Sequence, residues 1–380
     1  MIAPAVFGIA IILVTLWEAF ETVVLPRRVA RRFRLTVLYY RSTWFAWRAI
    51  ARTMKKRNRR ETFLSFYGPL SLLMLFVVWA AAIISGFGLL YYAASVRSGA
   101  FHNLGTAFYL SGTTMFTLGL GDVVPRTSIQ RALAVIQSGL GFGFLALVLS
   151  YLPVIYQAFS RREVNIVLLD ARAGSPPSAA ELLRRHAGTE GVRDLEQLLH
   201  DWERAAAEIM ESHISYPVVC YFRSQHNNES WLGALVAILD TCTILLANYE
   251  GAVARQARLT FAICRHTIVD LAQVFYAPPK LTSNRLPSPE LERLRTALAG
   301  TDYRLRDTDE SNAKMQKLRD MYEPSVQSLS RRLAFEVPPF ILPRELADNW
   351  KTTAWGRITS SSRTPNPGLA VDAATDAHAD

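Results

Sequence analysis

The chain has 380 residues, half of them hydrophobic, and a formal net charge of +10. Residues 27–60 contain 13 Lys and Arg and no acidic residue, so the rest of the chain is slightly acidic. One basic cluster between long apolar runs indicates the inner face of a membrane and argues against a nucleic-acid partner. The three cysteines form no C-x-x-C pair, and we interpret them as reduced core residues: Cys220, Cys242 and Cys264.

Residues 1–26 are predicted to form the first transmembrane helix. The stretch is apolar apart from Glu18 and Glu21, and no basic residue precedes it as in a signal peptide. Arginines follow at once, and positive residues stay on the inner side. We therefore predict a multi-pass protein of the cell membrane with its N-terminus outside and its C-terminal part in the cytoplasm. The two glutamates share a helical face, where they either pair with the arginines or sense pH or ions.

Residues 27–61 form a basic segment, and the pattern over 36–60 predicts an amphipathic helix on the membrane surface. Its cations recur at helical spacing, so we expect them to face anionic lipids; they are Arg41, Arg48, Arg52 and Lys55. They serve either to anchor the helix, with Trp44 and Trp47 as interfacial residues, or to let lipids regulate the protein. A voltage sensor is disfavoured because these cations lie outside an apolar span.

Residues 62–160 are predicted to be a pore domain. Residues 62–96 and 132–160 carry no charge over 35 and 29 positions, and each run can cross a hydrocarbon layer of ~30 Å as a helix. Between them we expect a short helix over 104–115 with Asn103 as its N-cap. The following loop is too short to span the membrane, so it should enter and leave on the same side.

The loop contains TLGLGD, which places a glycine at every second position. Glycine adopts left-handed backbone angles at no steric cost, and alternating hands can turn successive carbonyls to one side. Such a column of oxygens can replace the water shell of a monovalent cation. The predicted ion-binding residues are Thr117, Leu118, Gly119, Leu120 and Gly121, with both leucine side chains turned away from the axis and packed behind it.

TLGLGDVVP resembles the filter of pore-loop potassium channels, which reads Thr-Val-Gly-Tyr-Gly-Asp, often with a proline three residues on. The variant with leucine before the second glycine is similar to one found in two-pore-domain potassium channels. The resemblance covers about residues 62–160 and implies a K+ filter completed by four chains, with Asp122 holding its mouth. Two departures, Leu120 for tyrosine and Phe116 for threonine, leave a non-selective monovalent cation channel as an alternative.

Two positions in the inner helix are candidate gating hinges. Gly141 lies 19 residues after Asp122, which resembles the position of the hinge glycine in that family, and Pro153 interrupts the helical hydrogen bonds. The alternative for the glycine is close helix packing.

Residues 161–350 are predicted to form a helical cytoplasmic domain, with Ser178 and Glu181 in a capping box, and residues 351–380 a disordered tail. Residues 231–248 are apolar but contain Asp240, so they form either a buried core helix, which we favour, or a fourth span. Residues 277–289 form a linker. No nucleotide-binding motif or metal cluster is visible, and 212–231 is either a ligand site or a set of core hydrogen bonds, which we favour.

Taken together, the sequence predicts an all-α membrane protein with three transmembrane helices, a re-entrant pore helix with its filter loop, and a helical cytoplasmic domain. The predicted function is passive K+ conduction by a homotetramer, with no catalysis, no cofactor and K+ as the permeant ion held by backbone carbonyls. Besides the non-selective channel, the alternatives are a non-conducting membrane sensor with a degenerate pore and a subunit of a K+ transporter. The last is disfavoured because such proteins carry four loops in one chain.

Overall fold

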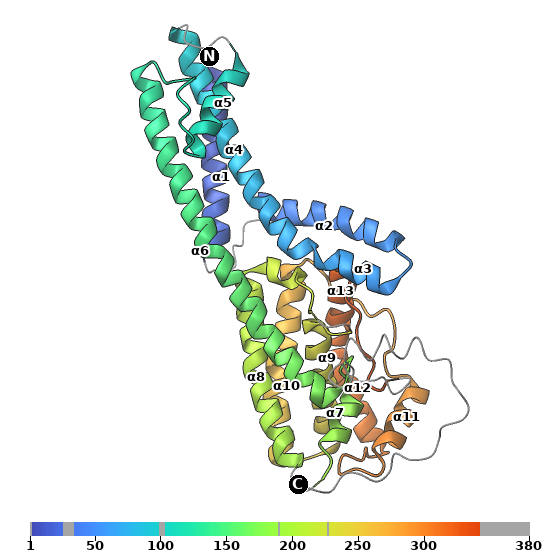
Figure 1. Cartoon of the computed structure of the whole chain (residues 1–380). Coiled ribbons are helices and arrows are strands. Elements are labelled where there is room, and N and C mark those ends of the chain that lie inside the picture. Colours follow the sequence, from blue (N-terminus) through green and yellow to red (C-terminus); the bar gives the residue numbers. More distant parts are fainter. Residues whose placement is uncertain (1, 26–33, 99–102, 189–190, 226–227, 343–380) are drawn as a thin grey trace, which may run out of the picture.

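The computed structural model describes residues 2–25, 34–98, 103–188, 191–225 and 228–342. The described residues form helices and connections without a strand, in an elongated molecule with a helical bundle at one end and a helical domain at the other (Figure 1). The predicted tail, 351–380, lies outside the described residues. The all-helical fold class is confirmed.

The bundle consists of α1 (Ile2–Ala19) with its π-helical end η1 (Phe20–Val24), α4 (Tyr67–Ser98), α5 (Leu104–Met115) and the first half of α6 (Ser128–Ala173). Glycines let α1 and α4 approach closely, since a Cβ on Gly8 would lie 2.6 Å from the carbonyl oxygen of Gly86. Small residues at helix crossings are the usual way in which membrane helices pack.

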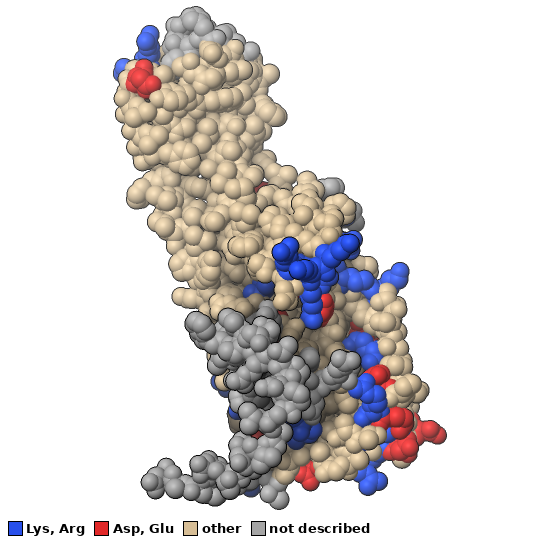
Figure 2. Space-filling view, turned by 45° about the vertical axis from the view of Figure 1, so that its right-hand side comes forward, with Lys and Arg blue, Asp and Glu red and all other residues tan. Residues whose placement is uncertain are grey.

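Four described helices are long and apolar enough to cross a membrane, and three of them belong to the bundle: Ile2–Val24, Arg57–Ser95 and Ser128–Ala173. The face of the bundle in Figure 2 is uncharged over most of its length, with charges at its tip and again about half-way down the molecule. The fourth candidate, α9 (Trp231–Asn248), is buried along its whole length inside the domain at the other end. This supports the favoured prediction of a core helix at this position.

The helix α6 continues from the bundle into the second domain without a break. Its 46 residues correspond to a length of roughly 69 Å. Thr127 and Gln130 form a capping box at its start, and Gly174, at φ 82°, ends it. One continuous helix therefore joins the two halves of the molecule (Figure 1).

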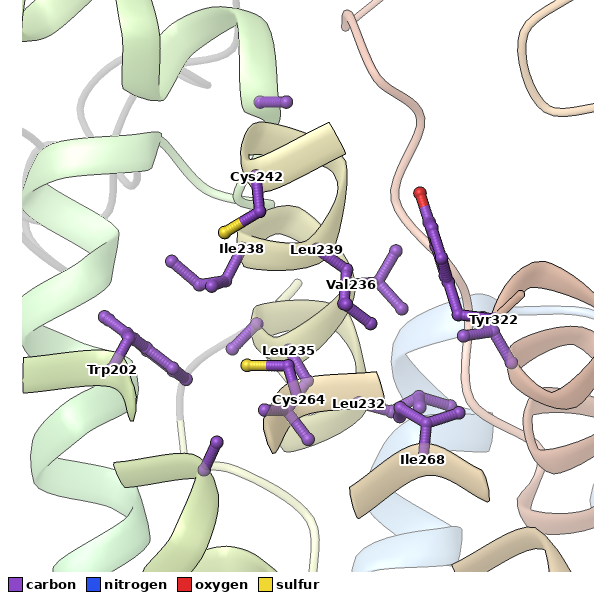
Figure 3. Close-up of a cluster of buried hydrophobic side chains, with 14 of the residues drawn as sticks. Trp202, Leu232, Leu235, Val236, Ile238, Leu239, Cys242, Cys264, Ile268 and Tyr322 are labelled. Carbon is purple, nitrogen blue, oxygen red and sulfur yellow. The ribbon is translucent and has the colours of Figure 1, made fainter. Parts of the chain in front are cut away.

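The C-terminal domain comprises the last turns of α6 and the helices that follow it: α7 (Ala179–Arg185), α8 (Gly191–Ser215), η2 (Pro217–Tyr221), α9, α10 (Ala252–Val274), α11 (Ser288–Leu298), α12 (Asp309–Asp320) and α13 (Glu323–Leu333). Its core surrounds α9, with Trp202, Ile238 and Tyr322 among the packed side chains (Figure 3). All three cysteines are free and buried, as predicted.

Asp240 shows how an apolar helix accommodates a buried carboxylate. Its oxygens accept hydrogen bonds from both terminal nitrogens of Arg285 and from the Tyr322 hydroxyl. A buried charge is tolerated when it is paired and hydrogen-bonded in this way. Asp240, which left open whether residues 231–248 form a core helix or a fourth span, thus forms an ion pair in the core.

The predicted surface helix over 36–60 is two helices, α2 (Leu35–Thr53) and α3 (Arg57–Ser65). They project from the bundle and lie over the C-terminal domain (Figure 1). Trp44 is only 2% exposed, and its indole nitrogen donates to the carbonyl oxygen of Arg332 at 2.8 Å. The interpretation of Trp44 as a membrane-interface residue was therefore wrong, because it packs into the protein core.

Candidate functional site: the filter loop and its supports

The candidate filter follows the short helix α5 directly. The Asn103 side chain accepts a hydrogen bond from the Gly105 backbone N–H at 2.8 Å, so it caps α5 as predicted. Residues 116–127 are neither helix nor strand, and α6 begins at Ser128. Because α4 ends and α6 begins at the same end of the bundle, the loop returns to the end from which α5 started (Figure 1).

The backbone φ angle alternates in sign along the loop. Thr117, Gly119 and Gly121 have positive φ angles of 57°, 55° and 83°. The two glycines adopt this conformation freely, whereas Thr117 does so against the clash of its own Cβ. The structure therefore contains the alternation expected from TLGLGD and extends it by one residue.

The loop is open on one side. Residues 116–122 are all exposed, including the apolar side chains of Phe116, Leu118 and Leu120, which are 58–66% exposed. Within the described ranges, no donor reaches the backbone carbonyls of residues 117–121. In a single chain neither leucine is packed behind the loop as predicted. Partners from outside the chain must cover both the carbonyls and the apolar side chains if this segment lies at membrane depth.

Hydrogen bonds to α5 hold the start of the loop. The Leu118 N–H donates to the Thr113 carbonyl at 2.8 Å, and the Thr117 N–H donates to the Thr114 carbonyl at 3.1 Å. The start of the candidate filter is therefore tied to one helix. At the other end of the loop Asp122 is exposed, and its role in holding the mouth stays a prediction.

A buried amide behind the loop was not singled out in the sequence. Gln137 of α6 donates from Nε2 to the Ser111 carbonyl at 2.9 Å and to its hydroxyl at 2.7 Å, and that hydroxyl donates to the Ile84 carbonyl. Gln137 and Ser111 are both fully buried. The three helices α4, α5 and α6 are thus joined at one point, which fixes the position of α5 and of the loop it carries.

Gly141 lies against the end of α5. A Cβ at this position would lie 2.2 Å from the Met115 carbonyl oxygen, whereas Gly139 and Gly143 have no atom within 4 Å of theirs. This contact is the close-packing role that the sequence left open as the alternative to a hinge. The helix also continues through Pro153, which is exposed. A hinge at either residue stays a prediction.

The geometry of this region agrees with a comparison to known families. Residues 70–157, from early α4 to the middle of α6, match the family model described as an ion channel. The resemblance to ion channels is confirmed. An uncharacterized membrane protein of Bacillus subtilis (strain 168), YdjJ, is 25% identical over 184 residues, which cover 47% of this chain and 52% of the relative. The chain thus spans about half the length of this curated relative. No solved structure matches.

The segment that matches the ion-channel model is joined to the C-terminal domain by a buried arginine five residues beyond its matched end. Arg162 of α6 donates to the carbonyls of Val219 and Phe222 at 3.1 and 3.0 Å, and it contacts Glu163 and His213. Burial and the neighbouring guanidinium keep the pKa of His213 well below its usual range. This neutral histidine belongs to the core hydrogen bonds favoured for 212–231. His226 lies outside the described residues.

The four cations predicted to face lipid differ in how exposed they are. Arg41, Arg52 and Lys55 are exposed, whereas Arg48 is half-buried and donates to the Arg331 carbonyl at 2.8 Å. Arg48 therefore contacts the C-terminal domain beside Trp44. One face of α2 binds protein, and three cations remain on surfaces open to other partners.

The paired glutamates at the end of α1 are engaged by protein. Glu18 accepts from the Thr36 backbone N–H at 3.1 Å and from its hydroxyl, so it caps the start of α2. Glu21 lies 3.6 Å from Arg34 and accepts from the Trp17 indole at 2.7 Å. The predicted pairing with the following arginines holds for Glu21. For Glu18 the structure records contacts with the start of α2.

The groups that the site offers to a cation are oxygens. Among the described residues, no group of three His, Cys, Asp or Glu side chains could hold a metal ion. The groups available to a cation in the loop are backbone carbonyls, the Thr117 hydroxyl and the Asp122 carboxylate. These are hard oxygen ligands, which suit a weakly bound permeant cation.

Proposed function

We propose that this protein is a potassium-selective ion channel formed by four copies of the chain, with K+ passing down its gradient between the loops. The observation that carries the proposal is the filter backbone: three positive φ angles at alternate residues beside carbonyls without a donor. Each chain supplies one side of such a path, so several copies around an axis are needed to surround an ion. The same copies would cover Phe116, Leu118 and Leu120.

The proposed topology places α1, α4 and the first half of α6 across the membrane, with α5 and the loop re-entrant. The uncharged surface of the bundle in Figure 2 supports this, as do the arginines that follow α1. The N-terminus then lies outside, and the C-terminal domain lies in the cytoplasm. On this topology Arg41, Arg52 and Lys55 stand near the inner headgroups, where anionic lipids attract them.

Flux through reconstituted protein tests the proposal. Liposomes containing the full chain should release K+ along its gradient, and Gly119→Asp should reduce that flux at least tenfold by placing a carboxylate in the path. Gly251→Asp is the matched control, because Gly251 also has a positive φ and open space around its Cβ position but lies far away in a turn before α10. Equal flux through wild type and Gly119→Asp would refute the pore and favour a non-conducting sensor.

Selectivity is decided by reversal potentials in mixed K+ and Na+. A K+ channel should follow the K+ gradient when Na+ replaces K+ on one side. The alternative of a non-selective cation channel rests on Leu120, which is 66% exposed and offers no hydroxyl to tether the filter sideways. A reversal potential that ignores the K+ gradient would establish this alternative.

A further inference from the structure

A cavity of about 360 Å³ lies where the bundle meets the C-terminal domain. Its wall is shared by η1, the start of α2, the middle of α6, η2 and the ends of α8, α10 and α13. Its volume is within the range of small-molecule sites, at the lower end. No role in the proposed conduction path uses this cavity.

The lengths of two helices independently indicate how deep in the membrane the cavity lies. Glu21 on the cavity wall lies 19 residues after the start of α1, or roughly 29 Å along the helix. Tyr151 on the opposite side lies 23 residues after the start of α6, or roughly 35 Å. Both lengths are close to the ~30 Å thickness of a hydrocarbon core, the second being slightly longer. With the proposed topology, the cavity therefore stands at the inner headgroup level.

The wall combines apolar surface with cations. Leu25, Val218, Val274 and Phe275 contribute apolar atoms, and Arg34, Arg41 and Arg332 contribute guanidinium groups. Glu21 is the acidic residue of the wall, and it is paired with Arg34. The C-terminal ends of α8 and α10 each add a partial negative charge of about half a unit, and the start of α2 adds a partial positive charge of the same size. The net field in the cavity remains positive.

One hydrogen-bond donor of Arg332 lacks an acceptor within the described residues. Its Nε is buried without a hydrogen-bond partner in the described part of the chain, although its carbonyl oxygen is bound by Trp44. A buried donor without an acceptor costs free energy that a bound anion would recover. An arginine is also well suited to phosphate and carboxylate oxygens.

We propose that this cavity binds an anionic amphiphile, a membrane lipid whose headgroup contacts Arg332 and Arg41 and whose chain lies along the apolar wall. An occupant would contact α6 at Tyr151, between the filter supports and Arg162. The regulatory consequence of lipid binding rests on the proposed function: a bound lipid stabilises one position of α6 relative to the C-terminal domain. Channel opening then depends on the anionic lipid content of the membrane.

Binding is measured on the detergent-solubilised full chain by native mass spectrometry with dioctanoyl phosphatidylglycerol. We expect retention of one lipid per chain, at least tenfold weaker retention of dioctanoyl phosphatidylcholine, and no competition by inorganic phosphate. Competition by sodium laurate would support the site and identify a free fatty acid as a second source of the ligand. Equal retention of the two phospholipids, or full competition by phosphate alone, would overturn the proposal.

Variants locate the binding. Arg332→Gln and Arg41→Gln should each weaken phosphatidylglycerol retention about tenfold, whereas Arg258→Gln, an exposed arginine of α10 outside the cavity, should leave it unchanged. Val274→Trp, which fills the cavity, should abolish retention while the protein still elutes as a single species. Unchanged retention in Arg332→Gln and Val274→Trp would overturn the site.

Flux separates this site from the pore. Wild-type K+ flux should rise at least threefold from phosphatidylcholine liposomes to liposomes with added phosphatidylglycerol, and Arg332→Gln should lose that dependence. Flux that is equal in both lipids despite retained binding would overturn the regulatory role. Absence of flux in every lipid, with binding intact, would refute the proposed pore and leave the lipid site supported.

Discussion

Replacing Gly141 by alanine distinguishes packing from bending as the role of this glycine. The added Cβ would lie 2.2 Å from the Met115 carbonyl oxygen, and ordinary contacts begin at 3.4 Å. The oxygen is backbone at the end of α5, so α5 and α6 must separate by roughly 1 Å. Gly139 and Gly143 are the matched controls, because nothing lies within 4 Å of a Cβ at either position.

The size of the effect follows from two opposing terms. Overpacking of this kind costs about 1–3 kcal/mol, while alanine in place of a helical glycine gains up to about 1 kcal/mol. Gly141→Ala should therefore be less stable than the two control variants by about 1–3 kcal/mol per chain, and less stable than wild type by up to about 2 kcal/mol. Gly139→Ala and Gly143→Ala should be neutral or slightly more stable, since they gain the helix term alone.

The measurements are the temperature at which purified protein loses its single elution peak and the K+ flux of the same sample. We expect Gly141→Ala to lose its peak several degrees below the two control variants and to conduct less than wild type, because the end of α5 carries the filter. If Gly141 acted only as a hinge, Gly141→Ala would change channel opening and leave the stability of the protein unchanged. Gly141→Ala as stable as Gly143→Ala would refute the packing argument.

Three further substitutions test the C-terminal domain by denaturant unfolding. Arg162→Gln should cost about 3 kcal/mol because it leaves buried carbonyls unpaired, whereas the adjacent exposed Arg161→Gln should change stability by less than about 0.5 kcal/mol. The pKa of His213 is lowered in the fold, so below about pH 6.5 the unfolded chain binds an extra proton. Stability should fall there by up to about 1.4 kcal/mol per pH unit. His213→Gln should reduce this slope and exposed His200→Gln should not; equal slopes would contradict the assignment. Asp240→Asn should lose about 2–4 kcal/mol, and an unchanged unfolding midpoint would show that its ion pair adds nothing.

The filter region was predictable because its local chemistry is restrictive. Asn103 caps a helix whose bounds were foreseen, and glycines at alternate positions make available the left-handed conformations that the loop adopts at 119 and 121. Thr117 was foreseen as an oxygen ligand, although its own left-handed conformation was not, since threonine avoids that region. Here the local sequence and the structure agree.

The docking of α2 was missed because its pattern has two physical explanations. Trp44 and Trp47 on one face of a basic helix suit a membrane surface, and they suit a protein surface equally well. The partner is the end of α13, nearly 290 residues further along the chain, so no local signal indicates it. Arg48 faces the same partner and was misassigned to lipid for the same reason.

The role of Gln137 was missed for another reason. A glutamine inside an apolar run must find a partner, but Ser111 lies 26 residues away on a different helix. Gly141 presents a related ambiguity, because one glycine permits both bending and close approach. Only the position of the Met115 carbonyl distinguishes the two. Long-range contacts between helices, not local propensity, therefore decide the supports of the filter.

A signal from the C-terminal domain has two routes to the filter, α4, whose first turns pack against η2, and α6, which runs through both parts of the molecule. The helix α6 touches the end of α5 at Gly141 and is held in the domain by Arg162, 21 residues or roughly 32 Å further on. Pro153 lies between the two points and removes one backbone hydrogen bond from that segment. Along this second route, a shift of the domain therefore either moves α6 as a rigid rod, displacing α5 at Gly141, or is absorbed at Pro153. Because the cavity wall includes Tyr151, a ligand bound there lies beside the residue that decides between these two responses.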